Sequence, residues 1–357
     1  MTVKLIIFSL LLASYVHASP QDINGAWKGF SEPEIMASGF THSFNALPLE
    51  GAMAPSKKGW SGHYWPTQKG SINYRWNTPE PRGFGTVSPS RAEVMSMSPE
   101  AIALLAPSEK YDLYMGNYDY PTKKAASNFS NAGASDWAGL CHGWAPAALN
   151  HNEPTPKVVT NPDGIQIPFG STDIKALVSF YYAFIDDSSD MAHQVGLRCF
   201  FGSWLGGARG CGEDLNAGAF HIVAANMLGL RKEGFLSDVD RYKEVWNQPV
   251  VGYKTTILAD NLKPEGSAAR TAVKEMRVAT EFFYVDESEI LTWDVAFGTK
   301  EQKISKKDLV YRLEINAAGQ IVGGEWESEV RPDFLWNKGA VKEFKGMMSL
   351  LPNLLND

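Results

Sequence analysis

The sequence predicts an α+β protein whose helices and strands occupy separate parts of the chain. Between residues 135 and 185 the apolar residues recur at helical spacing, as in DIKALVSFYYAFI. After Phe220 the chain changes to short runs of β-branched and aromatic residues that end at turn residues. A chain in which the helices come first and the strands later is typical of α+β folds. A chain in which helices and strands alternate would instead favour an α/β fold with a parallel sheet.

The N-terminal third is predicted to be rich in loops. Residues 19 to about 95 contain many Gly, Pro, Ser and aromatic residues and show little periodicity. Ser98 and Pro99 then open a short apolar helix, with the serine as its cap and the proline in its first turn. We therefore expect a loop-rich N-terminal region over residues 19–125 that packs on a main domain over residues 126–357.

Two helices are expected at the centre of the chain. One begins near Cys141, although Pro146 would remove a hydrogen bond from its interior unless the helix kinks there or begins later. The other is DIKALVSFYYAFI, where Asp173 can cap the N-terminus.

The later segments predict an antiparallel sheet. GFLSD, EVWNQPVVGYKTTI and TEFFYVDESEILTWDVAF are predicted strands, and LVYRLEINAAGQIVGGEW is a predicted hairpin that turns at Asn-Ala-Ala-Gly. FHIVAANML is too short an apolar run to distinguish a strand from a helix.

The first residues predict export from the cytoplasm. Met1–Ala18 carries Lys4, then an apolar stretch from Leu5, then small residues before a cleavage point, so Ser19 is the expected first residue of the mature chain. The apolar stretch is short against the roughly 20 residues that cross a bilayer. We expect a signal peptide over residues 1–18 and an extracellular protein.

Composition argues against two classes of partner. Without Lys4 the 33 basic side chains become 32, against 40 acidic ones, which gives a net charge of −8. The basic residues are scattered, so nucleic acid and anionic membranes are not expected as partners. With 44% hydrophobic residues the chain can form a core without a disulfide framework.

Three cysteines in an exported chain suggest one disulfide and one free thiol. Cys199 and Cys211 flank a Gly-rich stretch and are the predicted disulfide, which leaves Cys141 free. The alternative is that all three are reduced and buried. No CxxC motif or Cys/His cluster at zinc spacing is present in the sequence.

Cys141 is the candidate nucleophile. A thiol attacks a carbonyl carbon as thiolate, and a helix N-terminus lowers the pKa of a cysteine. Cys141 follows a glycine where a loop is predicted to become a helix, which suits such activation. The alternative is an inert cysteine in the core.

His221 is the candidate base, because it begins an apolar segment that would hold its ring in the interior. The alternative is a core histidine with a structural hydrogen bond. His142 adjoins Cys141 in sequence and is not expected to point at the same atom, and His193 is a weak candidate. Polar or loop contexts surround His42, His63 and His151.

A third residue is needed to orient the imidazole. Asp238 follows His221 by 17 residues and would return beside it if the chain forms a hairpin that turns between Leu230 and Gly234. Asn247 is the second choice, since an amide can serve the same purpose. Either residue could instead cap a turn.

Four stretches carry a resemblance to a known family: GLCHGWAPAAL, DIKALVSFYY, FHIVAANMLG through GFLSDV, and EVWNQPVVGYK. They resemble the secreted transglutaminase elicitors of plant-pathogenic oomycetes, which have relatives in marine bacteria. The resemblance runs from about residue 55 to residue 336 and includes the segments WSGHYWP and GGEWESEVRPDFLW. WNQPV matches the segment that plants sense in the oomycete proteins, but Val251 and Tyr253 stand where that segment often has Arg and Phe.

The resemblance implies an enzyme that crosslinks Gln and Lys side chains of proteins. It implies a triad of Cys141, His221 and Asp238 on a papain-like α+β core, in which the helix that bears the nucleophile packs against an antiparallel sheet. Calcium dependence is known for members of the family, so the resemblance makes calcium a candidate cofactor, although no contiguous calcium loop is present in this sequence. Two alternatives stay open: a cysteine protease or glutamine deamidase with the same triad, and a recognition module without catalysis.

Overall fold

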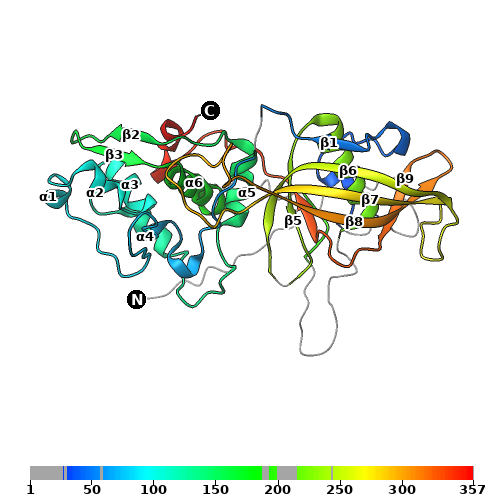
Figure 1. The fold of residues 1–357 in the computed structure, drawn as a ribbon, viewed down its shortest axis with the longest axis horizontal. Coiled ribbons are helices and arrows are strands. Elements are labelled where there is room, and N and C mark those ends of the chain that lie inside the picture. Colours follow the sequence, from blue (N-terminus) through cyan, green and yellow to red (C-terminus); the bar gives the residue numbers. More distant parts are fainter. Residues whose placement is uncertain are drawn as a thin grey trace.

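The computed structural model describes residues 27, 30–56, 59–186, 193–198, 215–242 and 244–356. Figure 1 shows an elongated molecule with a helical half at one end and long strands at the other. Helix α5 and strand β5 lie where the two halves meet. This combination of helices with an antiparallel sheet confirms the α+β class.

The N-terminal part consists of short elements separated by loops, as predicted. The helix expected at Ser98 is α2, and the Ser98 hydroxyl accepts a hydrogen bond from the Ala101 N–H at 3.3 Å. The elements are η1 (Pro33–Ile35), η2 (Phe44–Ala46), β1 (Glu50–Ala52), η3 (Thr67–Lys69), η4 (Ser71–Asn73), α1 (Arg91–Val94), α2 (Pro99–Ala103), α3 (Pro107–Tyr114) and α4 (Pro121–Ser127).

Both predicted central helices are present. They are α5 (Cys141–Asn150) and α6 (Ser171–Phe180), and a π-helical turn, η5 (Tyr181–Ile185), extends the second. Asp173 lies inside the first turn of α6 rather than at its cap, where it accepts a hydrogen bond from the Gly170 N–H at 2.7 Å. A hairpin of β2 (Lys157–Thr160) and β3 (Gln166–Phe169) joins the helices.

The ambiguous segment FHIVAANML is helical. It forms α7 (Ala217–Ala224) and the π-helical turn η7 (Ala225–Arg231). The Asn216 side chain caps α7 by accepting a hydrogen bond from the Gly218 N–H at 2.8 Å. The turn expected between Leu230 and Gly234 therefore follows a helix and does not close a hairpin.

The predicted strands belong to one antiparallel sheet in the order β4-β10-β5-β6-β7-β8-β9, with β1 paired to β6. The prediction for TEFFYVDESEILTWDVAF is wrong in its second half, because β7 ends at Asp286 and residues 287–297 form no strand. The predicted hairpin is β8–β9, and Gly319 in its turn has a φ of +77° that favours glycine. The strands are β4 (Gln194–Val195), β5 (Phe235–Asp238), β6 (Asn247–Leu262), β7 (Ala272–Asp286), β8 (Lys303–Asn316), β9 (Ile321–Trp326) and β10 (Phe334–Trp336).

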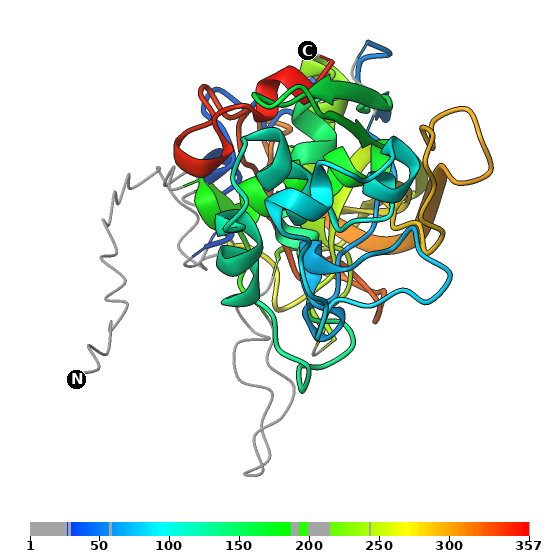
Figure 2. The same cartoon turned by 90° about the vertical axis from the view of Figure 1, so that its left-hand side faces the viewer.

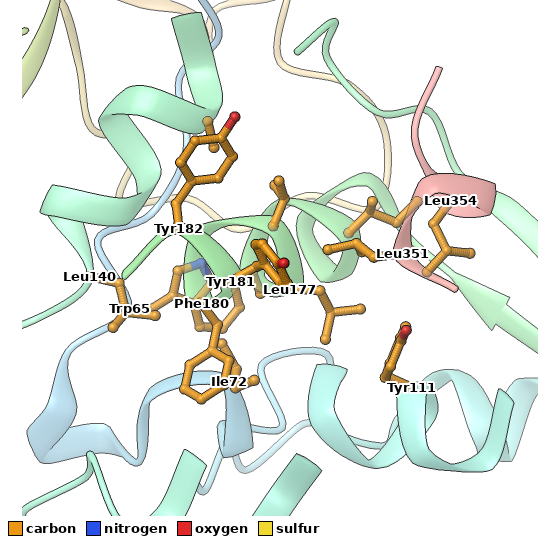
Figure 3. Packing of buried hydrophobic residues seen from close by; sticks show 14 of the residues in the cluster. Trp65, Ile72, Tyr111, Leu140, Leu177, Phe180, Tyr181, Tyr182, Leu351 and Leu354 are labelled. Carbon is orange, nitrogen blue, oxygen red and sulfur yellow. The ribbon is translucent and has the colours of Figure 1, made fainter. Parts of the chain in front are cut away.

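Two cores lie on opposite faces of the sheet. The first joins α5 and α6 to the N-terminal elements and to the C-terminal turns η8 (Gly346–Met348) and η9 (Leu351–Leu354). Figure 3 shows part of this core in close-up, where Leu177 and Phe180 of α6 lie among residues of the N-terminal part and of η9. In Figure 2 the C-terminal segment, in red, lies beside the helices of this half. The second core packs α7 on the sheet. Strand β5 separates them, because Leu236 belongs to the first core and Phe235 to the second.

Three expectations concern the ends and domains of the chain. The predicted signal peptide over residues 1–18 and the predicted Cys199–Cys211 disulfide both lie outside the described residues. Within the described ranges, no helix combines the length and hydrophobicity needed to cross a membrane. Trp60 and Trp65 share the first core with α5 and α6, and the boundary predicted between residues 125 and 126 stays a prediction.

Candidate active site

Cys141 is the first residue of α5, where the sequence placed it. Leu140 precedes the helix and hydrogen-bonds through its N–H to the carbonyl of Tyr64. Pro146 lies inside the helix and supplies no N–H for the carbonyl one turn earlier. The Cys141 side chain is buried, with 5% of the residue exposed. The thiol therefore lies at the start of α5, where the helical half of the molecule meets the sheet.

The thiol contacts the chain around the start of β6. The Sγ atom lies 3.6 Å from the Val245 carbonyl oxygen, to which the S–H donates, and 3.7 Å from the Asn247 Nδ2. On the other side of the amide, the Trp336 Nε1 donates to the Asn247 Oδ1 at 2.8 Å. Because an indole N–H can only donate, this bond fixes the amide so that its NH₂ group faces the sulfur.

The surroundings of the thiol favour its neutral form. Burial raises the pKa of Cys141 to about 11, and the nearby carboxyls of Glu287 and Asp238 act in the same direction. Hydrogen bonds from the backbone and side chain of Asn247 oppose this shift but are outweighed. In this structure burial thus acts on the thiol pKa in the direction opposite to the one expected from the helix N-terminus.

Asp238 lies close to this group on the neighbouring strand. It is directly opposite Asn247 in the pairing of β5 with β6, and its Oδ1 accepts a hydrogen bond from the Trp246 N–H at 3.0 Å. Burial raises the pKa of Asp238 to about 8, while the Trp246 N–H opposes the shift. Asp238 thus holds the backbone next to Asn247 and does so in a fully buried position.

His221 lies elsewhere. Its Nδ1 is 2.9 Å from the Tyr311 hydroxyl, and its ring stacks on Phe44 with centroids 5.9 Å apart. Burial lowers the pKa of His221 to about 4. Helix α7 belongs to the second core, so the sheet separates this ring from Cys141. The described contacts bring Cys141, Asn247 and Asp238 together and do not bring His221 to them.

Sequence reasoning missed three residues around the thiol. Tyr64 donates through its hydroxyl to the Asp136 carbonyl at 2.8 Å and packs edge-on against Trp246, with ring centroids 5.6 Å apart. Trp336 and Glu287 follow no recognisable motif. The sequence offered only an indirect indication for Trp336, which is the last residue of the segment that shares the family resemblance.

No metal site accompanies this group in the part of the chain that the structure describes. There, no cluster of three or more His, Cys, Asp or Glu side chains has an arrangement that could hold a metal ion.

Comparison with known proteins gives two matches. A sequence model of the family described as transglutaminase elicitor matches residues 119–346, well over half of the chain. The fold is similar to that in the crystal structure of the GP42 transglutaminase from Phytophthora sojae, with a TM-score of 0.63 and 23% sequence identity over 90% of this chain and 94% of that chain. A comparison with curated proteins gave no match. The chain belongs to the transglutaminase elicitor family.

Proposed function

We propose that this protein is a secreted protein-glutamine γ-glutamyltransferase that joins Gln to Lys side chains of proteins through a thioester on Cys141. The observation that carries the proposal is the buried thiol at the start of α5, held by an Asn247 amide that Trp336 orients. Membership of the transglutaminase elicitor family supports this chemistry. A nucleophile on a helix that packs against an antiparallel sheet also supports a papain-like core.

In the first half-reaction the Cys141 sulfur attacks the γ-carboxamide carbon of a Gln side chain. The carbonyl oxygen becomes an oxyanion, for which the Cys141 backbone N–H and the Asn247 Nδ2 are suitable donors. Collapse of this intermediate breaks the C–N bond, and a proton must reach the departing nitrogen to release ammonia. The product is a thioester between the substrate and Cys141.

In the second half-reaction a neutral Lys ε-amine attacks the thioester carbon. The C–S bond breaks, the amine loses a proton, and the thiol is restored with an isopeptide bond as product. Net transfer requires that the site admits the amine and limits water. The edge-on contact of Tyr64 with Trp246 beside the thiol, and the burial of Cys141, support such a site.

The other two members of the predicted triad have contacts that suit other roles. Asp238 supports the strand that carries Asn247, through its hydrogen bond to Trp246. The bond from His221 to Tyr311 suits a structural role in the second core. The catalytic assignments of His221 and Asp238 stay predictions that mutation can test.

Incorporation of a dansyl-labelled primary amine into casein tests the proposal, with ammonia measured in the same reaction. We expect label in casein and one ammonia released for each label, and no label with Cys141→Ser. Ammonia with only glutamate formed would make the protein a deamidase, and cleavage of the casein backbone would make it a protease. Parallel reactions with calcium and with a chelator show whether calcium is a cofactor.

A further inference from the structure

We propose that Tyr64, Trp246 and Glu244 form an acceptor subsite, which binds the ammonium group of a substrate Lys side chain before the amine reacts at Cys141. The inference rests on the proposed function, because an acceptor is needed only if the thioester is passed to an amine. It deepens that function by naming the residues that distinguish a Lys side chain from an uncharged nucleophile such as water.

Tyr64 lies against the chain that leads to the thiol. Its backbone carbonyl accepts a hydrogen bond from the N–H of Leu140, the residue before Cys141. Its hydroxyl donates to the Asp136 carbonyl at 2.8 Å. Its ring packs directly on the backbone of Gly139, where a Cβ atom would lie 2.6 Å from the Tyr64 Cδ2. These contacts fix the ring beside the start of α5.

Trp246 belongs to the other segment that holds the thiol. It stands between Val245, whose carbonyl oxygen is 3.6 Å from the Sγ atom, and Asn247, whose amide nitrogen is 3.7 Å from it. Its ring meets the ring of Tyr64 edge-on, with centroids 5.6 Å apart. The two rings therefore connect the two segments that flank Cys141. Both residues are partly exposed, so a substrate can reach this aromatic pair from solvent.

Acidic groups lie around the aromatic pair. The exposed Glu244 accepts a hydrogen bond from the Trp246 Nε1 at 3.2 Å. Burial raises the pKa of Tyr64, and the negative charges of Glu287 and Asp136 raise it further. A substrate group with a positive charge is therefore favoured beside these rings.

A Lys side chain has the chemistry that this pair would recognise. It combines an apolar stem with an ammonium group, and the faces of Trp and Tyr rings attract cations. An exposed lysine has a pKa of about 10.4, so nearly every acceptor arrives as a cation at pH 7. Because water carries no charge, the subsite would raise the local concentration of the amine alone. The bound amine then loses its proton when it attacks the thioester.

The kinetic test compares a cationic acceptor, N-acetyl-lysine methylamide, with hydroxylamine, which is uncharged at neutral pH. We expect Trp246→Leu, Tyr64→Leu and Glu244→Gln to raise the KM for the lysine derivative roughly 3-fold to 30-fold with little change in kcat. The KM for hydroxylamine should stay at the wild-type value. Glu244→Gln removes only a charge at an exposed position, so it tests the subsite even if a ring variant fails to fold.

Phe84→Leu and Glu80→Gln are the controls, since they replace an exposed aromatic residue and an exposed acid of the N-terminal part. They should change neither KM. An equal rise for both nucleophiles, or no rise for the lysine derivative, would overturn the inference.

Equilibrium binding to Cys141→Ser tests the subsite without turnover. N-acetyl-lysine methylamide should give a saturable change in tryptophan fluorescence, because its ammonium group would lie against Trp246. N-acetyl-norleucine methylamide has the same stem without the charge and should give none, and the response to lysine should disappear when Trp246→Leu is added. An equal response to both probes, or no response to either, contradicts the subsite. A wild-type protein that transfers no amine would refute the proposed function instead, and this measurement would still decide whether the Lys side chain binds here.

Discussion

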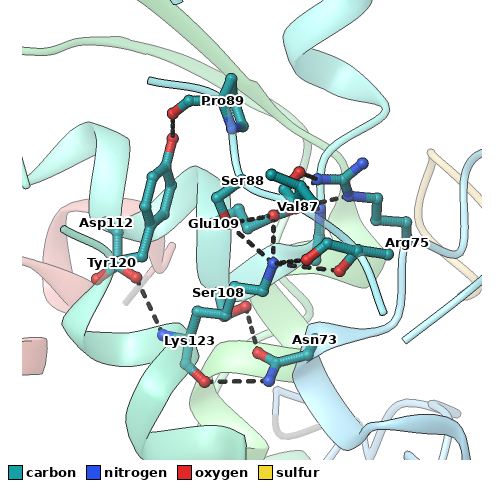
Figure 4. Close-up of polar contacts among 12 residues, drawn as sticks. Asn73, Arg75, Val87, Ser88, Pro89, Ser108, Glu109, Asp112, Tyr120 and Lys123 are labelled. Atoms are coloured by element: carbon teal, nitrogen blue, oxygen red, sulfur yellow. Dashed lines mark hydrogen bonds and ion pairs between the residues drawn. The ribbon is translucent and has the colours of Figure 1, made fainter. Parts of the chain in front are cut away.

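Glu109 connects three side chains in the helical half, as Figure 4 shows. Its fully buried carboxylate accepts hydrogen bonds from Arg75 at 2.8 Å, Lys123 at 2.8 Å and Ser88 at 2.7 Å. Burial by itself would raise the pKa of Glu109, but the hydrogen bonds and charges of Arg75 and Lys123 lower it to about 2. This carboxylate is therefore ionised under all conditions in which the protein is expected to work.

Glu109→Gln should destabilise the fold, because two cations would lose their buried counter-charge. We expect the free energy of unfolding in urea to fall by about 3–5 kcal/mol. In wild type the stabilisation is present above the ordinary pKa of 4.5 and is lost as the pH falls from there toward 2. The exposed pair Glu80 and Arg82 offers a control, and Glu80→Gln should change stability little. Equal effects of the two substitutions would contradict this account of Glu109.

Substitutions at Asn247 and Asp238 can distinguish two roles. Asn247 contacts the thiol, whereas Asp238 supports the strand that carries Asn247. Asn247→Ala removes a donor beside the sulfur and should lower kcat/KM roughly 100-fold to 1,000-fold with the fold intact. Asp238→Asn should cost less activity, since a carboxyl whose pKa is about 8 is mostly protonated at pH 7 and asparagine can still accept from the Trp246 N–H. If Asp238→Asn is the more damaging change, Asp238 has the orienting role predicted from the sequence.

At the scale of elements, several of the longer segments followed from local pattern. The β8–β9 hairpin, strand β5 and helices α5 and α6 appear where periodicity and turn residues predicted them. The segment from Phe220 to Leu228 did not, because a short apolar run fits a strand as well as a helix. The packing of this segment on the sheet favours the helix, and a local sequence pattern does not reveal such a long-range contact. Because this segment is a helix, it cannot form the hairpin that was expected to place Asp238 beside His221.

Gly218 shows what fixes α7 on the sheet. A Cβ atom at this position would lie 2.4 Å from the carbonyl oxygen of Gly323 in β9, so only glycine lets the helix approach so closely. Gly218→Ala should therefore lower the free energy of unfolding by about 1–3 kcal/mol, measured in urea. Gly339→Ala is the control, since a Cβ there meets nothing within 4 Å. A change at Gly218 no larger than at Gly339 would show that α7 can shift without cost.

At the scale of the whole molecule, the α+β class and the place of Cys141 at the start of a helix were predictable, whereas the surroundings of this thiol were not. Cys141 could be found because glycine, helix start and family motif coincide in one short stretch. Trp336, which donates to Asn247, and Tyr64 and Glu287, which interact with the thiol electrostatically, come from distant parts of the chain. The burial that raises the pKa of the thiol also arises only from this assembly, so the sequence pointed to the opposite shift.

The most direct test of the central claim is mass spectrometry of a Gln-containing peptide and a Lys-containing peptide incubated with the protein. We predict a product in which the two side chains are joined by an isopeptide bond with loss of ammonia. Cys141→Ser should form none of it while unfolding at the wild-type temperature. Crosslinked product from Cys141→Ser, or only glutamate or cleaved peptides from the wild-type protein, would contradict the account.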